Sequence, residues 1–513
     1  MRIAVNVVCK LLTVAASVLG IASDFGFNAF GVAYAFEQPP NFVWIIADDM
    51  SPDIAAYGAQ GVLTPNLDAL AASGKRYTRA YASAPVCSSS RSAFILGCYQ
   101  TTTGLHAHDV ENPQPLAAPY EPLPTQLRKA GWFVTNAAAP GSMRNGRPIR
   151  VGKTHYNFAH TSDEMFDGDD FRKRKPGQPF FAQFQITEPH RPFPIPTDFD
   201  ESKIKSLQLP KNYPDHPLMR RDWYAYQRSV EVVDKRVGAI LEQLKSEGVL
   251  DNTIVMFFAD HGRPMPWGKQ WLNIEGLQVP LIIAGPEVNR ATIEEQCVSL
   301  IDLAPTVLQV AQLPVPAWME GEPILNLNNV ANDRTHVFAA RDRCGDAQDR
   351  IRAMIGVDLL LVRNFHPDVS RLNWSSYKEE SYPGMPLFRV LGIDHELNGL
   401  QSSWLASTRS EFELYDLKRD PHGIENVAQE NGFGEAMIAM QSTLEKWSKT
   451  TGDRGALPDP ATEPSLAEIQ QNKREGYNRT WLKRLGTQEP TDRERLAWWE
   501  KSYGLLSESK DLK

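Results

Sequence analysis

The sequence predicts an α/β fold around a mostly parallel sheet, because buried strands and amphipathic helices alternate along much of the chain. Three runs, 42–47, 253–259 and 279–283, are almost continuously apolar. Continuous apolarity is typical of parallel strands that helices cover on both faces. We therefore place these runs in the centre of one sheet.

Two helices are expected between these strands. Thr64-Pro65 supplies an N-cap and a proline at the first helical position, and Gly74 ends that helix. A longer helix is predicted from about Asp222 to Gly248, because its apolar residues recur on one stripe. Both helices fit the alternation that a parallel sheet requires.

The sequence changes character after about residue 335. We expect a main domain over 36–335 and a smaller C-terminal α+β subdomain with a charged tail over 336–513. Short strand-like pieces at 351–355 and 359–363 alternate with loops there.

Residues 1–35 are predicted to be a signal peptide. Arg2 and Lys10 precede an apolar run over 11–22, and Ala33-Tyr34-Ala35 provides an A-x-A cleavage pattern. That run is too short to span a bilayer, and no later stretch reaches the roughly 20 apolar residues that a membrane helix needs. We expect an exported protein, periplasmic or extracellular (lysosomal in a eukaryote), with no membrane attachment after cleavage; a retained N-terminal anchor is the alternative.

The composition excludes several classes of protein. With 42% hydrophobic and 23% charged residues, the 513-residue chain is neither disordered nor collagen-like. A net charge of −8 argues against a nucleic-acid partner, so local arginines and lysines must attract any anionic substrate. Five cysteines are too few to build a disulfide scaffold of this size.

Acidic pairs follow two of the predicted strands. Asp48 and Asp49 come directly after one strand, and Asp260 and His261 come directly after another. Ligands of open α/β sheets bind beyond the carboxyl ends of the strands, so both pairs should face one crevice. Carboxylates gathered there repel each other unless a cation neutralises them. We expect these residues to bind one divalent metal ion, Ca²⁺ by preference. Mg²⁺ or Mn²⁺ is also possible, because His261 is a softer ligand than Ca²⁺ prefers. The alternative is that each aspartate only caps the turn that follows its strand.

The segment Ala84-Pro85-Val86-Cys87-Ser88-Ser89-Ser90-Arg91-Ser92 carries a further signal. It resembles the signature of the type I sulfatase family, C-x-P-S-R followed by a short helix that ends in T-G. Cys87, Ser90, Arg91 and Gly97 match this pattern. Ser89 stands where the family has proline, and Leu96 stands where it has threonine.

Other segments resemble the family in the same order over roughly residues 40–430. They are Gly152-Lys153-Thr154-His155, Pro179-Phe180-Phe181, Glu188-Pro189-His190-Arg191-Pro192, Ala259-Asp260-His261-Gly262, Trp267-Gly268-Lys269, Val279-Pro280-Leu281, Asp302-Leu303-Ala304-Pro305-Thr306 and Glu413-Leu414-Tyr415-Asp416-Leu417. Within the family, the spacing around Asp260 and Lys269 looks most like the heparan N-sulfatase branch and its bacterial relatives. The resemblance implies an alkaline-phosphatase-like sheet, with 36–335 as the catalytic domain.

The resemblance also implies an activity, the hydrolysis of sulfate esters or sulfamates on sulfated carbohydrate. In the family, a separate formylglycine-generating enzyme oxidises the cysteine at position 87, and the hydrated aldehyde is the nucleophile. The metal ligands would be Asp48, Asp49, Asp260, His261 and the modified Cys87. Arg91 and Lys153 would hold the nucleophile and His155 would be a base. His190 and Lys269 would bind sulfate oxygens, and one of them would protonate the leaving atom.

Two alternatives remain open at this point. One is a phosphonate or phosphate ester hydrolase of the same superfamily, since related enzymes share the metal site. The other is a catalytically silent relative that binds sulfated glycans, in which Ser89 blocks maturation of Cys87. We also consider His106 and His108 as residues that line the substrate pocket.

Overall fold

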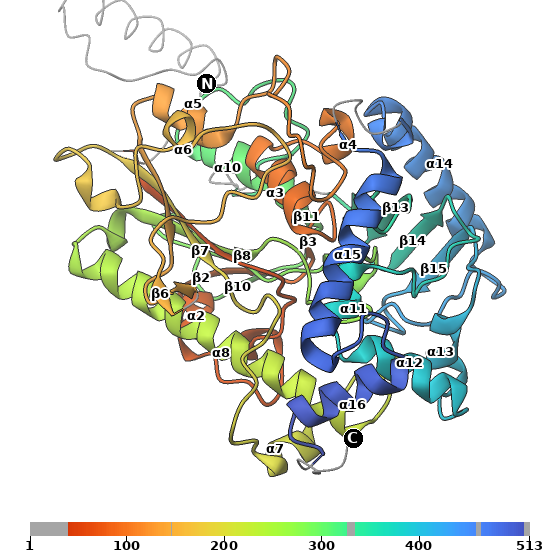
Figure 1. The fold of residues 1–513 in the computed structure, drawn as a ribbon. Coiled ribbons are helices and arrows are strands. Elements are labelled where there is room, and N and C mark those ends of the chain that lie inside the picture. Colours follow the sequence, from red (N-terminus) through yellow and green to blue (C-terminus); the bar gives the residue numbers. More distant parts are fainter. Residues whose placement is uncertain (1–38, 145, 326–333, 458–462, 507–513) are drawn as a thin grey trace, which may run out of the picture. The chain divides into compact units, whose positions relative to one another are not determined.

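Seven strands form the central sheet of the computed structural model, in the order β10-β2-β9-β8-β1-β7-β4 (Figure 1). Their bounds in this order are β10 (Thr292–Glu294), β2 (Gly74–Tyr77), β9 (Leu281–Ala284), β8 (Thr253–Ala259), β1 (Asn41–Ala47), β7 (Phe180–Ile186) and β4 (Phe133–Ala138). The structure describes residues 39–144, 146–325, 334–457 and 463–506. The predicted signal peptide therefore lies outside the described residues.

The sheet is mostly parallel, as the sequence predicts. Strand β1 pairs in parallel with β7 and β8, and β4 continues the same direction beside β7. Strand β9 is the exception, because it runs antiparallel to both β8 and β2. We expected that apolar run to be parallel, which is wrong. A strand buried on both faces has the same apolar pattern in either direction.

Helices cover both faces of this sheet (Figure 1). Helices α2 (Pro65–Ser73) and α8 (Pro217–Ser246) lie on one side, and α3 (Cys87–Leu96), α5 (Leu123–Lys129) and α10 (Leu303–Val310) lie on the other. Helix α8 begins at Pro217 rather than near Asp222, because His216 caps it and accepts a hydrogen bond from the Leu218 N–H.

Aromatic packing fixes α3 on the sheet. The Trp44 ring of β1 meets the rings of Phe94, Phe181 and Phe258 edge-on, at centroid distances of 5.9, 5.2 and 5.4 Å. Phe94 belongs to α3, and its ring also lies 5.4 Å from that of Phe258 in β8. Such pairs add directional stabilisation to apolar burial. The contact places the first turn of α3 above the ends of β1 and β8.

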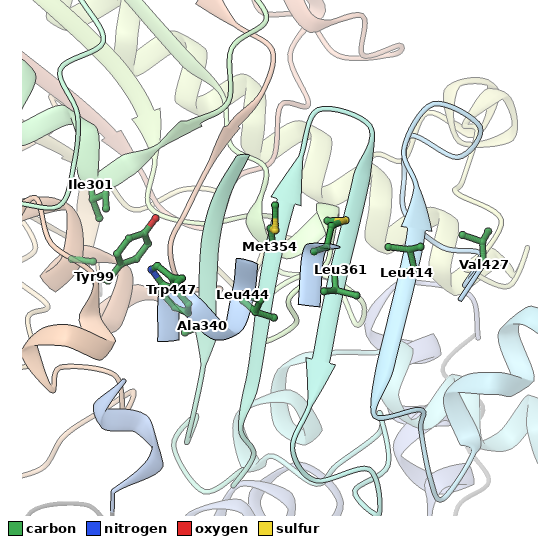
Figure 2. Packing of buried hydrophobic residues seen from close by; sticks show 11 residues of the cluster. Tyr99, Ile301, Ala340, Met354, Leu361, Leu414, Val427, Leu444 and Trp447 are labelled. Carbon is green, nitrogen blue, oxygen red and sulfur yellow. The ribbon is translucent and has the colours of Figure 1, made fainter. Parts of the chain in front are cut away.

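A separate antiparallel sheet follows in the sequence. Its strands are, in spatial order, β12 (His336–Arg341), β13 (Ile351–Gly356), β14 (Leu359–Asn364) and β15 (Phe412–Asp416). Helix α14 (Gly434–Thr450) packs on it through Leu444 and Trp447, as Figure 2 shows. The Trp447 ring lies 5.1 Å from that of Tyr99, a residue just beyond α3. The boundary between the two predicted domains stays a prediction.

The remaining helices and strands are short or lie near the C-terminus. The helices are α4 (Gln100–Thr103), α6 (Ser162–Met165), α7 (Glu201–Ser206), α9 (Ile274–Leu277), α11 (Ser376–Ser381), α12 (Gly384–Ile393), α13 (Gly399–Ser402), α15 (Leu466–Leu485) and α16 (Asp492–Ser502). The strands are β3 (Ala80–Tyr81), β5 (Met143–Arg144), β6 (Arg147–Pro148) and β11 (Val298–Ser299). Within the described part of the chain, no helix is both long and apolar enough to cross a membrane.

Candidate active site

The two acidic pairs lie side by side at the ends of β1 and β8. Ala47 pairs with Ala259 in the register of these neighbouring parallel strands, so the residues that follow leave the sheet together. The backbone N–H of Asp49 donates to Asp260 Oδ1 at 2.9 Å. The structure thus brings together the two strand ends that the sequence singles out.

The backbone at both strand ends has special geometry. Asp49 has a φ of +62°, in the left-handed region that residues other than glycine rarely adopt. Gly262 follows His261, and a Cβ atom there would lie 1.9 Å from the carbonyl oxygen of Glu275. Only glycine allows this close approach of the two segments.

Cys87 is the first residue of α3 and is buried beside these groups. Its Sγ lies 3.3 Å from His261 Nε2, 3.4 Å from Lys269 Nζ and 3.6 Å from Asp49 Oδ1. Burial raises the pKa of the thiol, but Lys153, Lys269 and His261 together hold that pKa well below its usual value. Cys87, Cys98, Cys297 and Cys344 are all free thiols.

Arg91 links the strand ends from one turn further along α3. Its Nε donates to Asp260 Oδ2 at 2.8 Å, and its Nη2 donates to Asp48 Oδ1 at 3.1 Å. Its Nη1 donates to Gln185 Oε1 of β7 at 2.8 Å. Because the guanidinium is buried and bound on three sides, it holds the acidic residues in fixed positions.

Four side chains offer a donor set that fits a divalent cation. Asp49, Cys87, Asp260 and His261 are buried, and one possible ligand atom of each lies within 4.8 Å of the others. Burial raises the pKa of Asp260 to about 6, with Asp48 adding to the effect and Arg91 opposing it. Carboxylate oxygens and an imidazole suit Mg²⁺, Mn²⁺ and, through the oxygens, Ca²⁺. Crowded carboxylates of this kind are stabilised by a cation.

Asp48, the fifth predicted ligand, lies outside this group of four. Lys153 Nζ donates to both of its carboxylate oxygens at 2.8 Å. Burial opposes ionisation of Asp48, yet Lys153 and Arg91 hold its pKa below the usual value. Asp48 is therefore an ionised carboxylate neutralised by protein cations.

The predicted basic residues line a cavity of about 380 Å³ that opens above Cys87. They are Lys153, His155, His190 and Lys269. Lys269 Nζ lies 2.8 Å from Asp49 Oδ2, and His190 Nε2 lies 3.8 Å from the same oxygen. The lining near Asp49 thus presents two basic groups, which suits an anionic ligand.

His155 has a partner that the sequence did not reveal. Its Nε2 lies 2.9 Å from Asp109 Oδ1. Burial lowers the pKa of His155, but the hydrogen bond with Asp109 and the nearby thiol raise it to about 9. Asp109 belongs to no recognisable motif; its only sequence signal is its position next to His108, which lines the same cavity. His106 lines a different cavity, of about 290 Å³.

The C-terminal part of the chain supplies the outer wall of the cavity. This wall includes Ser376, Tyr377 and Glu380 from α11 and Lys473 from α15. None of these residues stands in a motif, so sequence reasoning missed them. The cavity is thus lined by residues from both predicted domains.

Comparison with known proteins identifies the family. Residues 40–313 match the sequence model of the family described as Sulfatase. The chain is 28% identical over 474 residues to an ulvan-active sulfatase of Formosa agariphila, and the match covers 82% of this chain and 77% of that protein. It is 25% identical over 498 residues to human N-sulphoglucosamine sulphohydrolase, covering 84% of this chain and 94% of that protein.

Solved structures share the fold. One, a complex with its substrate D-glucosamine-2-N,6-O-disulfate, has a TM-score of 0.56 and 17% identity, and covers 83% of this chain and 100% of that one. The phosphonate monoester hydrolase of Agrobacterium radiobacter has a TM-score of 0.58 and 17% identity, covering 80% of this chain and 96% of that one. The predicted alkaline-phosphatase-like fold class is confirmed.

The match to the family model spans more than half of the chain and contains both strand ends, α3 and the four predicted basic residues Lys153, His155, His190 and Lys269. The matches to the two curated relatives cover 77% and 94% of those proteins. This chain belongs to the sulfatase family.

Proposed function

We propose that this protein removes sulfate from sulfated carbohydrate, by hydrolysis of sulfate esters or sulfamates. The nucleophile is residue 87 after conversion of the cysteine to formylglycine by a separate maturation enzyme. One divalent cation, Ca²⁺ by preference, is held at the strand ends. The names of the two curated relatives, one ulvan-active and one acting on N-sulphoglucosamine, support a sulfated sugar as the substrate.

One observation carries this proposal: Cys87 Sγ lies within 3.6 Å of an aspartate, a histidine and a lysine, in a cavity that further basic groups help to line. A nucleophile in this position meets the sulfur atom of any sulfate group that the cavity binds. Holding the two reacting groups together removes much of the entropic barrier to their reaction.

Each side chain then has a role that its contacts support. Asp48, Asp49, Asp260, His261 and residue 87 hold the cation, and Arg91 and Lys153 bind the Asp48 carboxylate. When bound, a divalent cation lowers the pKa of a hydroxyl group and neutralises developing negative charge. Arg91 fixes the carboxylates, and Lys153 orients residue 87.

The histidines and Lys269 act on the substrate and the nucleophile. His155 accepts a proton from residue 87 after conversion of the thiol, whose charge helps to hold the His155 pKa at about 9, and Asp109 holds its ring in place. His190 and Lys269 bind the sulfate oxygens, and one of them donates a proton to the leaving oxygen or nitrogen. The position of all four basic residues in the lining of one cavity supports these roles.

We further propose that the chain is exported through residues 1–35 and acts in the periplasm or outside the cell. Residues 36–335 form the catalytic domain, and 336–513 form a subdomain that completes the substrate cavity. The residues of α11 and α15 in the cavity lining support this role of the C-terminal subdomain.

The test combines chemistry at residue 87 with turnover. The mature protein, made in a host with the maturation enzyme, is digested, and the residue-87 peptide is analysed by mass spectrometry, which separates aldehyde from thiol. Sulfate release is then measured with 4-nitrophenyl sulfate, N-sulfoglucosamine and glucosamine 6-sulfate, beside 4-nitrophenyl phosphate. An aldehyde with faster sulfate than phosphate release supports the proposal; the opposite preference would favour the phosphate ester hydrolase.

Ser89 gives this test a matched variant. Ser89 is the third residue of α3, where a backbone N–H has no partner inside the helix and proline is tolerated. Ser89→Pro therefore keeps the fold while it restores the family pattern, at the cost of the hydrogen bond from Ser89 Oγ to the His106 carbonyl at 3.0 Å. A thiol in the natural protein and an aldehyde in Ser89→Pro would identify the natural protein as the silent relative.

A further inference from the structure

Tyr377 has a hydroxyl group without a partner at the edge of the active-site cavity. The residue lies on α11 and lines the cavity. Its Oη atom is shielded from solvent and makes no hydrogen bond to any described residue. Buried polar groups are nearly always hydrogen-bonded, because an unmade bond costs free energy. Because Tyr377 also lines a cavity, a bound ligand can supply the missing hydrogen-bond partner.

Two basic side chains of the cavity lie beside the Tyr377 ring. Lys269 Nζ lies 4.9 Å from the centre of the Tyr377 ring, and the ring of His190 lies 5.9 Å from it. Both basic residues line the same cavity and lie next to Asp49. Burial raises the pKa of Tyr377 to about 12, so the hydroxyl keeps its proton and is a donor.

We propose that Tyr377 is a substrate-contacting residue whose hydroxyl donates a hydrogen bond to an oxygen of the bound sulfate group, beside Lys269. Its ring also restrains the Lys269 ammonium group through a cation–π contact. A sulfate oxygen fits better than a sugar hydroxyl, because the cations nearest to the ring attract the charged end of the substrate. This inference rests on the proposed function and adds a specificity contact from the C-terminal part of the chain.

The chain offers a matched control one turn away on the same segment. Tyr382 is fully buried, its hydroxyl also has no hydrogen-bond partner among the described residues, and its ring lies 5.5 Å from that of Tyr377. Tyr382 packs on Arg191 and does not line the cavity. Removal of its hydroxyl tests the effect of a buried Tyr→Phe change alone.

The experiment compares Tyr377→Phe and Tyr382→Phe with the natural protein. We measure kcat and KM with 4-nitrophenyl sulfate, inhibition by inorganic sulfate at constant ionic strength, and thermal stability. Tyr377→Phe should raise both KM and the sulfate inhibition constant roughly tenfold, because it removes one hydrogen bond to a charged oxygen. Tyr382→Phe should leave both constants unchanged, and neither variant should lose thermal stability.

Three results would overturn the inference. The first is a Tyr377→Phe variant with both constants within twofold of the natural protein. The second is a raised KM with an unchanged sulfate inhibition constant, which would move the contact to the sugar. The third is a loss of stability in Tyr377→Phe, which would give the hydroxyl a structural partner. If the natural protein turns over no sulfate ester, the proposed function fails instead, and calorimetric binding of inorganic sulfate to the two variants still tests Tyr377.

Discussion

The molecule contains two buried groups of charged residues that are built in opposite ways. Beside the small sheet, Arg352 uses all five of its N–H donors, bonding to Asp342, Asp453 and the carbonyl oxygens of Arg341 and Ile351. We refer to Arg352, Asp342 and Asp453 as the Arg352 network. Its central cation is satisfied by the protein itself, which is what a structural ion pair requires.

The strand-end group of Asp49, Cys87, Asp260 and His261 is different. Its ligand atoms crowd within 4.8 Å, and burial and Asp48 keep the pKa of Asp260 raised to about 6. We expect the group to gain stability when a cation binds, whereas the Arg352 guanidinium is already paired within the protein. The difference shows that burial of charge alone does not identify a functional site; incomplete compensation does.

The largest effect is expected from Cys87→Ala, which tests whether the strand-end group is functional. Sulfate release should fall to background, because the strand-end group loses its nucleophile, while thermal unfolding should stay close to that of the natural protein. Cys297→Ala is the control, since Cys297 is also a buried free thiol and its Sγ donates to the Thr335 carbonyl, away from the strand ends. Full activity in Cys87→Ala would remove residue 87 from the mechanism.

Removal of divalent metal should have the next largest effect. We expect a chelator to stop turnover and to lower the unfolding temperature, because a cation at one hundred times its Kd adds about 2.7 kcal/mol of stability. Re-addition of Ca²⁺, Mg²⁺ or Mn²⁺ one at a time, with calorimetry, identifies the ion. Asp260→Asn should abolish the metal-dependent rise in stability; an unchanged rise would contradict the assignment of the strand ends.

Asp453→Asn should act on stability rather than activity. Breaking the buried pair with Arg352 should cost about 3–5 kcal/mol in the free energy of unfolding, since a buried charge loses its partner. We expect kcat to stay within about twofold, because Asp453 does not line the catalytic cavity. Denaturant unfolding measures the first effect. Glu430→Gln, in the exposed pair with Arg419, is the control and should change little.

The pH dependence of the same variant sharpens this prediction. Burial raises the pKa of Asp453, but its bonds with Arg352 lower it to a net value of about 2. The folded-state pKa is thus below the unfolded one, so the stabilisation is complete above about pH 4 and is lost as the pH falls towards 2. The stability difference between natural protein and Asp453→Asn should shrink over that range. A constant difference would exclude ionised Asp453 as its source.

Asp109→Asn should have the smallest effect of these variants in free energy, and its effect should be on the rate. It removes the charge that holds His155 at 2.9 Å, and we expect kcat with 4-nitrophenyl sulfate to fall about tenfold while KM changes little. Asp109→Glu, which keeps the charge, should recover part of the rate. Equal losses in both variants, with a raised KM, would show that Asp109 shapes the cavity instead.

The strand ends could be predicted from the sequence because each is a continuous apolar run followed directly by acidic residues. Cys87 and Arg91 could be predicted because they stand in one short motif at a helix start. The direction of β9 could not, since its apolar pattern is the same in either direction. Asp109 and Tyr377 could not, because only the folded chain brings a loop after α4 and a C-terminal helix to the same cavity.

The burial of Cys87 has a consequence for biosynthesis. The residue is only 2% exposed, at the start of a helix that aromatic rings hold against the sheet. A second protein has no access to the thiol in this state, so any enzyme that oxidises it must act while the polypeptide is still unfolded. The order of events in the producing cell, oxidation first and folding second, would then decide what fraction of the molecules is ever active.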